Sequence, residues 1–118
     1  MKLTELADRI GAQIVLNAEK ATDIEVDRIY AGDTISRILS EVSNTTLLVT
    51  NLANSLLPRV ADLMDVPGIC LLNGVTPKTE LLGGASEHGT VILVSPVGMF
   101  ETCGRLYQCL VENVKTGA

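Results

Sequence analysis

The chain has 118 residues, of which 47% are apolar, so it can form one buried core and we expect a single domain over residues 1–118. Fourteen acidic and nine basic side chains give a net charge of −5, which disfavours binding to the phosphate backbone of nucleic acids. No stretch reaches the roughly 20 apolar residues that a bilayer crossing requires, and the start lacks the layout of a signal peptide, so we expect a cytoplasmic protein with no membrane contact.

The cysteines and the histidine give no pattern typical of a metal site or of catalysis. Cys70, Cys103 and Cys109 show no Cys-x-x-Cys spacing, and His88 is the only histidine. We therefore expect no metal and no other cofactor. The sequence also lacks the glycine-rich loops that bind triphosphates or dinucleotides. We expect no enzymatic activity, and an enzyme that uses Cys103 or His88 is the least favoured alternative.

The first third of the chain predicts two short strands and two amphipathic helices. Apolar residues at helical spacing predict a helix over residues 3–10 that stops at a glycine, and a strand follows at residues 13–16. Residues 26–31 predict a second strand. It ends at Gly32, which we expect to adopt a turn conformation that other residues resist, and Asp33 is expected to cap the next helix. The apolar residues of that helix are Ile35, Ile38, Leu39 and Val42.

Three later segments are apolar on both faces, which is typical of parallel strands covered by helices on two sides. They are residues 47–49, 69–72 and 91–94. The helix between the first two is expected to begin near Asn54 or Ser55, with Pro58 in its first turn, where proline is tolerated. The helix between the next two is expected to have Thr76 as its cap and Pro77 at its first position.

The last third of the chain predicts one helix that contains two glycines and a final helix with an apolar face. Gly83 and Gly84 fall within the helix that follows Thr76, and each weakens it by about 1 kcal/mol relative to alanine. The last helix is predicted to run from Met99. Its inward-facing residues are predicted to be Phe100, Cys103, Leu106, Tyr107 and Leu110.

Strands that alternate with helices predict an α/β fold, with a mainly parallel sheet, βαβ units and helices on both faces. In such sheets ligands bind beyond the carboxyl ends of the strands, next to helix N-termini. Small polar residues that follow the strands are therefore the candidate ligand-binding residues. They are Gly32, Asp33, Thr50, Asn51, Asn54, Asn73, Gly74, Thr76 and Ser95. The alternative is that these residues serve only local turns and helix caps, which favour the same residue types.

Three segments together resemble the DRTGG domain, and the resemblance covers nearly the whole chain. They are residues 29–36 (IYAGDTIS), 72–77 (LNGVTP) and 99–107 (MFETCGRLY). The resemblance implies a fold similar to the N-terminal domain of the HPr kinase/phosphorylase. Related domains occur within some phosphotransacetylases and within pyrophosphatases that carry nucleotide-sensing modules, where the role is regulatory or interfacial. Stand-alone versions are often encoded near iron-only hydrogenase components, which implies a redox- or hydrogenase-associated partner protein.

The sequence departs from the family pattern at two places. Thr50-Asn51-Leu52 stands where the family often has an Asp-Arg pair, and Asn73-Gly74 stands in place of a double glycine. A ligand that depends on that arginine would lose its partner here, although backbone N–H groups of such loops can still bind anions.

The sequence favours a non-catalytic regulatory or protein-interaction module with a small-ligand crevice at the strand ends. The alternative is a stand-alone sensor of a nucleotide or another small anion, in which ligand binding is the primary event. We also expect a homodimer, because the chain is apolar for its size. The expected dimer surfaces are the end of the last helix, at Leu110, Val111 and Val114, and the region of Tyr30.

Overall fold

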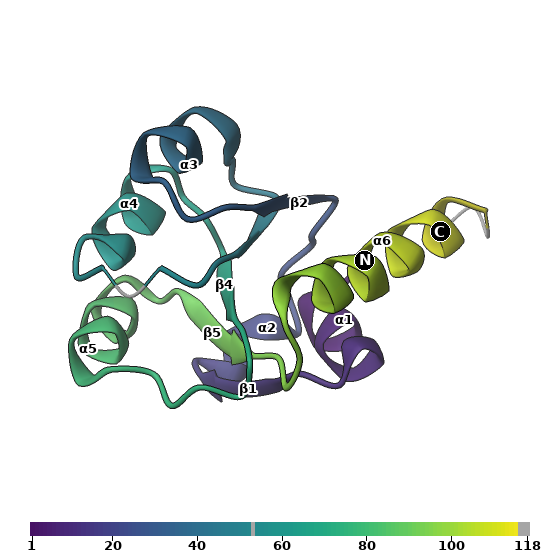
Figure 1. Cartoon of the computed structure of the whole chain (residues 1–118), viewed down its shortest axis with the longest axis horizontal. Helices are drawn as coiled ribbons and strands as arrows, with labels where there is room; N and C mark the ends of the chain where they lie inside the picture. Colours follow the sequence, from purple (N-terminus) through teal and green to yellow (C-terminus); the bar gives the residue numbers. More distant parts are fainter. Residues whose placement is uncertain (53, 116–118) are drawn as a thin grey trace.

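Figure 1 shows the computed structural model of the chain, which describes residues 1–52 and 54–115. Helices and strands alternate along most of the sequence. Their bounds are α1 (Leu3–Ile10), β1 (Gln13–Leu16), α2 (Ala18–Ala21), β2 (Arg28–Ala31), α3 (Ile35–Glu41), β3 (Thr46–Val49), α4 (Leu57–Leu63), β4 (Gly68–Leu71), α5 (Thr79–His88), β5 (Val91–Val94) and α6 (Met99–Lys115). The short helix α2 is not predicted by the sequence pattern.

The strands form one sheet in the order β1-β5-β4-β3-β2. The four strands from β2 to β5 are parallel and follow one another in sequence, while β1 pairs antiparallel with β5 at the edge. The predicted fold class is confirmed, with an antiparallel edge strand added to the parallel sheet.

Helices cover both faces of the sheet (Figure 1). The crossover helices α3, α4 and α5 pack on one face, while α1, α2 and α6 pack on the other. Side chains alternate along each central strand, so Leu47 and Val49 join the α1 and α6 side while Leu48 joins the crossover side. This alternation explains why strands β3, β4 and β5 are buried along their whole length and are almost entirely apolar: neither of their faces meets water.

The predicted inward face of the last helix is partly wrong. Leu106 is fully buried, but Phe100 is 94% exposed and Tyr107 is 72% exposed. The buried stripe of α6 includes Thr102, whose hydroxyl lies 2.8 Å from the Ser95 hydroxyl. Hydropathy favoured the aromatic residues over a threonine, whereas this hydrogen bond makes the threonine compatible with burial.

Two predicted helix caps are also wrong. The N-cap of α3 is Thr34 rather than Asp33, whose carboxylate binds another loop. Helix α5 begins at Thr79 with Lys78 as its N-cap, so Thr76 and Pro77 lie in the preceding loop. Helix α4 begins at Leu57 rather than near Asn54 or Ser55, but proline in its first turn is confirmed, because Pro58 stands just after Leu57.

Helices α4 and α5 approach each other closely at a glycine. A Cβ atom added to Gly84 would lie 2.7 Å from Cβ of Pro58, which is closer than non-bonded carbon atoms come. At Gly83 an added Cβ would meet nothing within 4 Å. Gly84 therefore permits the close packing of α4 against α5, whereas Gly83 does not contribute to it.

Candidate functional site

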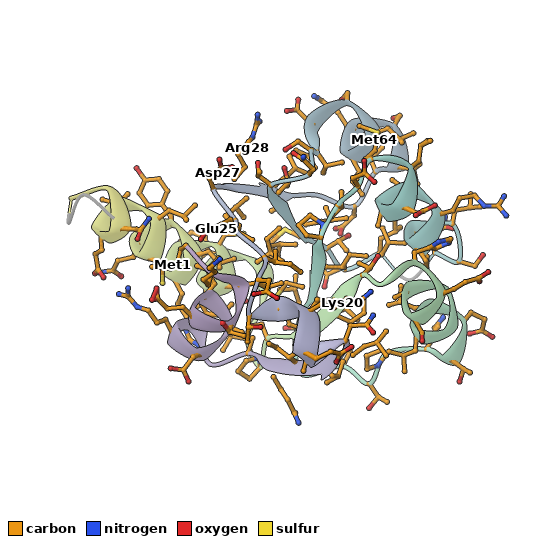
Figure 2. All side chains as sticks on the ribbon, turned by 180° about the vertical axis from the view of Figure 1, so that it is seen from behind. Met1, Lys20, Glu25, Asp27, Arg28 and Met64 are labelled. Atoms are coloured by element: carbon orange, nitrogen blue, oxygen red, sulfur yellow. The ribbon has the colours of Figure 1, made fainter. Side chains whose placement is uncertain are left out.

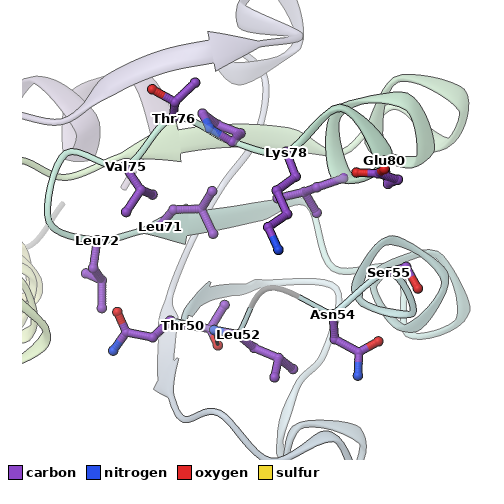
Figure 3. Close-up of a pocket in the computed structure, with 13 residues that line it drawn as sticks. Thr50, Leu52, Asn54, Ser55, Leu71, Leu72, Val75, Thr76, Lys78 and Glu80 are labelled. Carbon is purple, nitrogen blue, oxygen red and sulfur yellow. Dashed lines mark hydrogen bonds between the residues drawn. The ribbon is translucent and has the colours of Figure 1, made fainter.

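A cavity of about 640 Å³ lies where the sheet rule predicts it, between the loop that follows β3 and the loop that follows β4 (Figure 3). We call it the β3–β4 pocket. Its lining residues are Thr50, Asn51, Leu52, Asn54, Ser55, Leu71, Leu72, Val75, Thr76, Pro77, Lys78, Glu80 and Leu81. Four of the predicted site residues, Thr50, Asn51, Asn54 and Thr76, are among them.

The loop after β3 is held in place by a carboxylate from the neighbouring crossover. Thr50 Oγ1 donates to Asp33 Oδ1 at 2.9 Å, and the Asn51 backbone N–H donates to the same oxygen at 2.6 Å. Thr50 Oγ1 in turn accepts from the Leu52 N–H at 3.0 Å. Asp33 does not line the pocket, so its role is to position the residues that do.

Asn54 makes a local hydrogen bond in the turn that precedes helix α4. Its Oδ1 accepts from the Leu56 N–H at 2.7 Å, which forms an Asx turn ahead of the helix. Asn54 thus has the local role that the alternative interpretation assigned to it, and it also borders the pocket.

The other wall of the pocket is the segment that leads into α5. Lys78 is the N-cap residue of α5 and makes no capping hydrogen bond with its side chain. In Figure 3 this side chain extends into the pocket, and its amino group is directed toward the loop that holds Thr50 and Leu52. None of the ion pairs found in residues 1–52 and 54–115 involves Lys78. The pocket therefore holds one unpaired ammonium group.

The lining of the pocket is mixed, with about as much polar as apolar surface. Leu52, Leu71, Leu72, Val75 and Leu81 contribute hydrocarbon surface, and Glu80 in the first turn of α5 is the acidic lining residue. A pocket that combines hydrocarbon surface with polar groups can hold a small organic ligand and fix its orientation.

Asn73 and Gly74 form a structural turn at the same edge of the sheet and do not share the pocket. Their φ values are 59° and 61°, a left-handed pair that suits asparagine and glycine. The Asn73 N–H donates to the Val97 carbonyl at 2.9 Å, and the Gly74 N–H donates to the Ser95 carbonyl at 2.8 Å. Gly74 borders a smaller hollow of about 380 Å³ next to β1.

Ser95 is fully buried, and its hydroxyl pairs with Thr102. The expectation that Asn51, Asn73 and Ser95 meet in one crevice is therefore only half right. All three follow parallel strands at one edge of the sheet, but only Asn51 reaches the pocket. Asn73 instead forms the left-handed turn with Gly74, and the Ser95 hydroxyl is used within the core by Thr102.

Gly32 is constrained by a neighbouring side chain rather than by the backbone conformation that we predicted. Its φ is not in the left-handed region, so backbone strain does not select glycine. A Cβ atom would instead lie 3.0 Å from Cε2 and from the hydroxyl oxygen of Tyr30. The glycine makes room for the tyrosine ring at the end of β2.

The thiols are poorly suited to nucleophilic chemistry. Burial raises the pKa of Cys70 to about 12, and burial also raises the pKa of Cys103 and of Cys109. His88 lies at the far end of α5 from the pocket, with Nδ1 at 3.4 Å from Asp62 Oδ1. Among the described residues, no group of three or more His, Cys, Asp or Glu is placed to hold a metal ion. In that same part of the chain, no helix has the length and apolar content to span a membrane.

Comparisons with known proteins support the fold. No protein-family model matches the sequence, and no curated protein is significantly similar to it. A solved structure with a similar fold contains the CBS and DRTGG domains of the regulatory region of Clostridium perfringens pyrophosphatase, complexed with its activator, diadenosine tetraphosphate. The TM-score is 0.69 at 13% sequence identity, and the match covers 91% of this chain. This chain spans 46% of that one, and at such low identity the likeness concerns the fold alone.

Sequence reasoning missed the basic and apolar parts of the pocket. The predicted helix has Thr76 as its cap and Pro77 as its first residue, which places Lys78 within the first turn, whereas in the structure Lys78 is itself the N-cap. Leu71 and Leu81 were read as core residues, which they are, since each is more than 90% buried. Only the three-dimensional position of two loops shows that core residues also form the wall of a cavity.

Proposed function

We propose that this chain is a non-catalytic regulatory module of the DRTGG type that binds a small ligand in the β3–β4 pocket. The observation that carries the proposal is a cavity of about 640 Å³ at the strand ends, into which an unpaired lysine extends. Its volume lies within the range of about 300–1,000 Å³ that is usual for small-molecule sites. The likeness to a regulatory region supports the same class of function.

The lining predicts the chemistry of the ligand. Leucine side chains would cover an apolar or planar body, and the Lys78 ammonium would bind one anionic end. The uncapped N–H groups at the start of α5 would add partial positive charge near that end. A nucleoside monophosphate has both parts and is the candidate that we favour.

A nucleotide is supported by the similar structure, whose protein was crystallised with diadenosine tetraphosphate as its activator. The pocket described here has one lysine and one glutamate, and the chain carries a net charge of −5. A polyphosphate would bring several negative charges against a single ammonium group and an acidic protein. We therefore expect this chain to prefer a monophosphate over a triphosphate or tetraphosphate.

Binding would act by joining two loops that belong to different crossovers. The loop after β3 carries Thr50 and Asn51, while the segment before α5 carries Lys78. A ligand that contacts both would favour one arrangement of α4 relative to α5. A partner protein that binds preferentially to this arrangement of α4 and α5 would complete the regulatory function. The raised pKa of each of the three thiols supports a role without catalysis.

Thermal unfolding in the presence of adenosine, AMP, ATP, diadenosine tetraphosphate and inorganic phosphate tests the proposal. At 100 times its dissociation constant a ligand adds about 2.7 kcal/mol to the stability. We expect the largest shift of Tm with AMP. Lys78→Gln removes the ammonium group and should weaken binding by about 10- to 100-fold.

Arg37→Gln is the matched control, because it removes an exposed positive charge on α3 that does not line the pocket. It should leave the dissociation constant unchanged. If none of the five compounds raises Tm, or if Lys78→Gln and Arg37→Gln reduce binding equally, the proposed ligand site is wrong.

A further inference from the structure

The outer edge of β2 is the first of two neighbouring features that lack a partner in the chain. β2 is the last strand of the sheet and pairs only with β3. The N–H groups of Arg28 and Gly32 donate to carbonyls of residues 45 and 49, on the β3 side. Because N–H groups alternate in direction along a strand, those of Ile29 and Ala31 point away from β3. No strand within residues 1–52 and 54–115 covers this edge.

The second feature is an apolar flank of α6. Phe100 and Tyr107 are 94% and 72% exposed, and at 100° per residue they lie only about 20° apart around the helix. The opposite flank of α6 contacts α1. There Arg105 donates to the Ile10 carbonyl at 2.8 Å, and Glu112 pairs with Arg9.

These two features lie side by side. Helix α6 packs between α1 and β2, so the flank that faces away from α1 is next to the free edge of the sheet (Figure 1). Asp27 and Arg28 project outward beside this edge (Figure 2). Gly104 lies on the same flank between the two aromatic residues, and an added Cβ would meet nothing within 4 Å. The glycine would let another helix approach closely.

We propose that the β2 edge and the Phe100–Tyr107 flank form one surface that binds a second copy of this chain. The two β2 strands would pair antiparallel about a two-fold axis normal to the sheet, with Ile29 facing Ile29 of the second copy. Antiparallel strand pairing has this symmetry, so the same edge can serve both copies. This inference goes beyond the pocket and does not depend on a ligand.

The register follows from the groups that are free to bond. The outward N–H of Ile29 would donate to the carbonyl of Ile29 of the second copy, and that of Ala31 to the carbonyl of Asp27. The pair of residues 27 and 31 would have this one hydrogen bond, because the Asp27 N–H already donates to the Thr45 carbonyl at 3.1 Å. Arg28 would then lie opposite the ring of the second copy's Tyr30, which is a favourable pairing of a cation with an aromatic face. Asp27 would lie opposite Ala31. Within residues 27–31 no two like charges would face each other directly, although each copy carries a net charge of −5.

The same axis would bring the two α6 helices together. An axis normal to the sheet keeps both copies of α6 on one face, antiparallel to each other, with their aromatic flanks turned inward. Contact there would cover Phe100 and Tyr107, which are otherwise the most exposed large apolar side chains of α6. Neither residue was among the dimer contacts expected from the sequence. Of those, Leu110, Val111 and Tyr30 are half-buried within the chain, and the side chain of Val114 lies outside the described residues.

Disulfide trapping tests the register. Directly opposed residues of a hydrogen-bonded antiparallel pair have Cα atoms about 5.5 Å apart, within the range of about 4.4–6.8 Å that a disulfide bridges. Ile29→Cys should therefore form a covalent dimer under mild oxidation. Arg28→Cys should not, because residue 28 would face residue 30 of the second copy. The wild-type chain gives the background from its three native cysteines.

Light scattering after gel filtration, over a dilution series, tests the surface. The wild type should have twice the 12.5 kDa mass of one chain. The double variant Phe100→Asp/Tyr107→Asp should weaken the dimer by at least tenfold, whereas Gln108→Asp, at an exposed position on another side of α6, should not. A mass of one chain at all concentrations would overturn the proposal and assign the surface to a different protein. The proposal would also be overturned if the double variant dimerised as strongly as the wild type. Equal disulfide formation by Arg28→Cys and Ile29→Cys would overturn it as well.

Discussion

Asp33 controls the shape of the β3–β4 pocket without lining it. One oxygen of its carboxylate accepts hydrogen bonds from the Thr50 hydroxyl and from the Asn51 N–H, so the loop after β3 is tied to the end of β2. Thr50 is fully buried, and its hydroxyl depends on this acceptor. An aspartate that follows a strand and precedes a helix is easily read as a helix cap, since capping uses the same oxygen.

Two substitutions of Asp33 should distinguish the contribution of its charge to stability from that of its hydrogen bonds. Asp33→Ala removes both bonds and should lower the free energy of unfolding by about 1–2 kcal/mol. Asp33→Asn keeps an acceptor oxygen and should lose less than half of that. Chemical denaturation measures both values, with Asp23→Ala as the control, because Asp23 is exposed and its side chain has no hydrogen bond or ion pair among the described residues. An equal loss for Asp33→Ala and Asp23→Ala would contradict the role given to Asp33.

Cys70 should make the stability of the protein depend on alkaline pH. Burial raises its pKa from the ordinary value of 9.0 to about 12 in the folded chain. The unfolded chain would release the thiol proton near pH 9, whereas the folded chain holds it to about pH 12. Its contribution to stability is therefore complete below pH 9 and is lost as the pH rises from about 9 to 12.

Cys70→Ala tests this by removing the titrating group. Denaturation at several pH values above 9 should give a shallower fall of unfolding free energy for the variant than for the wild type. The absolute stability of the variant will be lower at all pH values because of the lost side chain volume, so the slopes are the quantity to compare. Parallel slopes would show that the thiol does not remain protonated in the folded chain.

At the scale of elements, the two adjacent glycines of α5 offer a matched pair. Both cost helix stability by propensity, but only Gly84 lies against Pro58 of α4. Gly83→Ala should therefore raise the free energy of unfolding by about 0.5–1 kcal/mol. Gly84→Ala should lower it, because the new methyl group would force α4 and α5 apart. Denaturant midpoints decide this, and the same sign for both variants would contradict the packing.

The turn between β4 and α5 has a conformation that the sequence predicts and hydrogen-bond partners that it does not. Asn73-Gly74 has the composition of a left-handed turn, and such a turn is found. Its N–H groups, however, bind the segment after β5, which is distant in sequence. Turn chemistry predicts the local conformation, but it cannot predict which neighbouring loop uses the free donors.

At the scale of the whole molecule, the sheet was the most predictable part. The fully apolar segments at β3, β4 and β5 require cover on both faces, and this alone implies helices on two sides. The helix ends and the exposed face of α6 were less predictable, because burial there depends on side-chain hydrogen bonds such as that of Thr102. The location of the pocket can be predicted from the sheet topology. The role of Lys78 cannot be predicted without the correct N-terminus of α5, which lies two residues later than the sequence pattern indicates.

The two faces of the sheet are built from very different sequence separations. On one face α3, α4 and α5 each lie between the strands that they connect, so their contacts close short loops. On the other face α1 packs against α6, and β1 pairs with β5, which joins segments from opposite halves of the chain. Closing a long loop costs more conformational entropy, although the cost rises slowly with length. The crossover face is therefore the natural place for folding to begin, and the face that carries the aromatic flank of α6 is completed late.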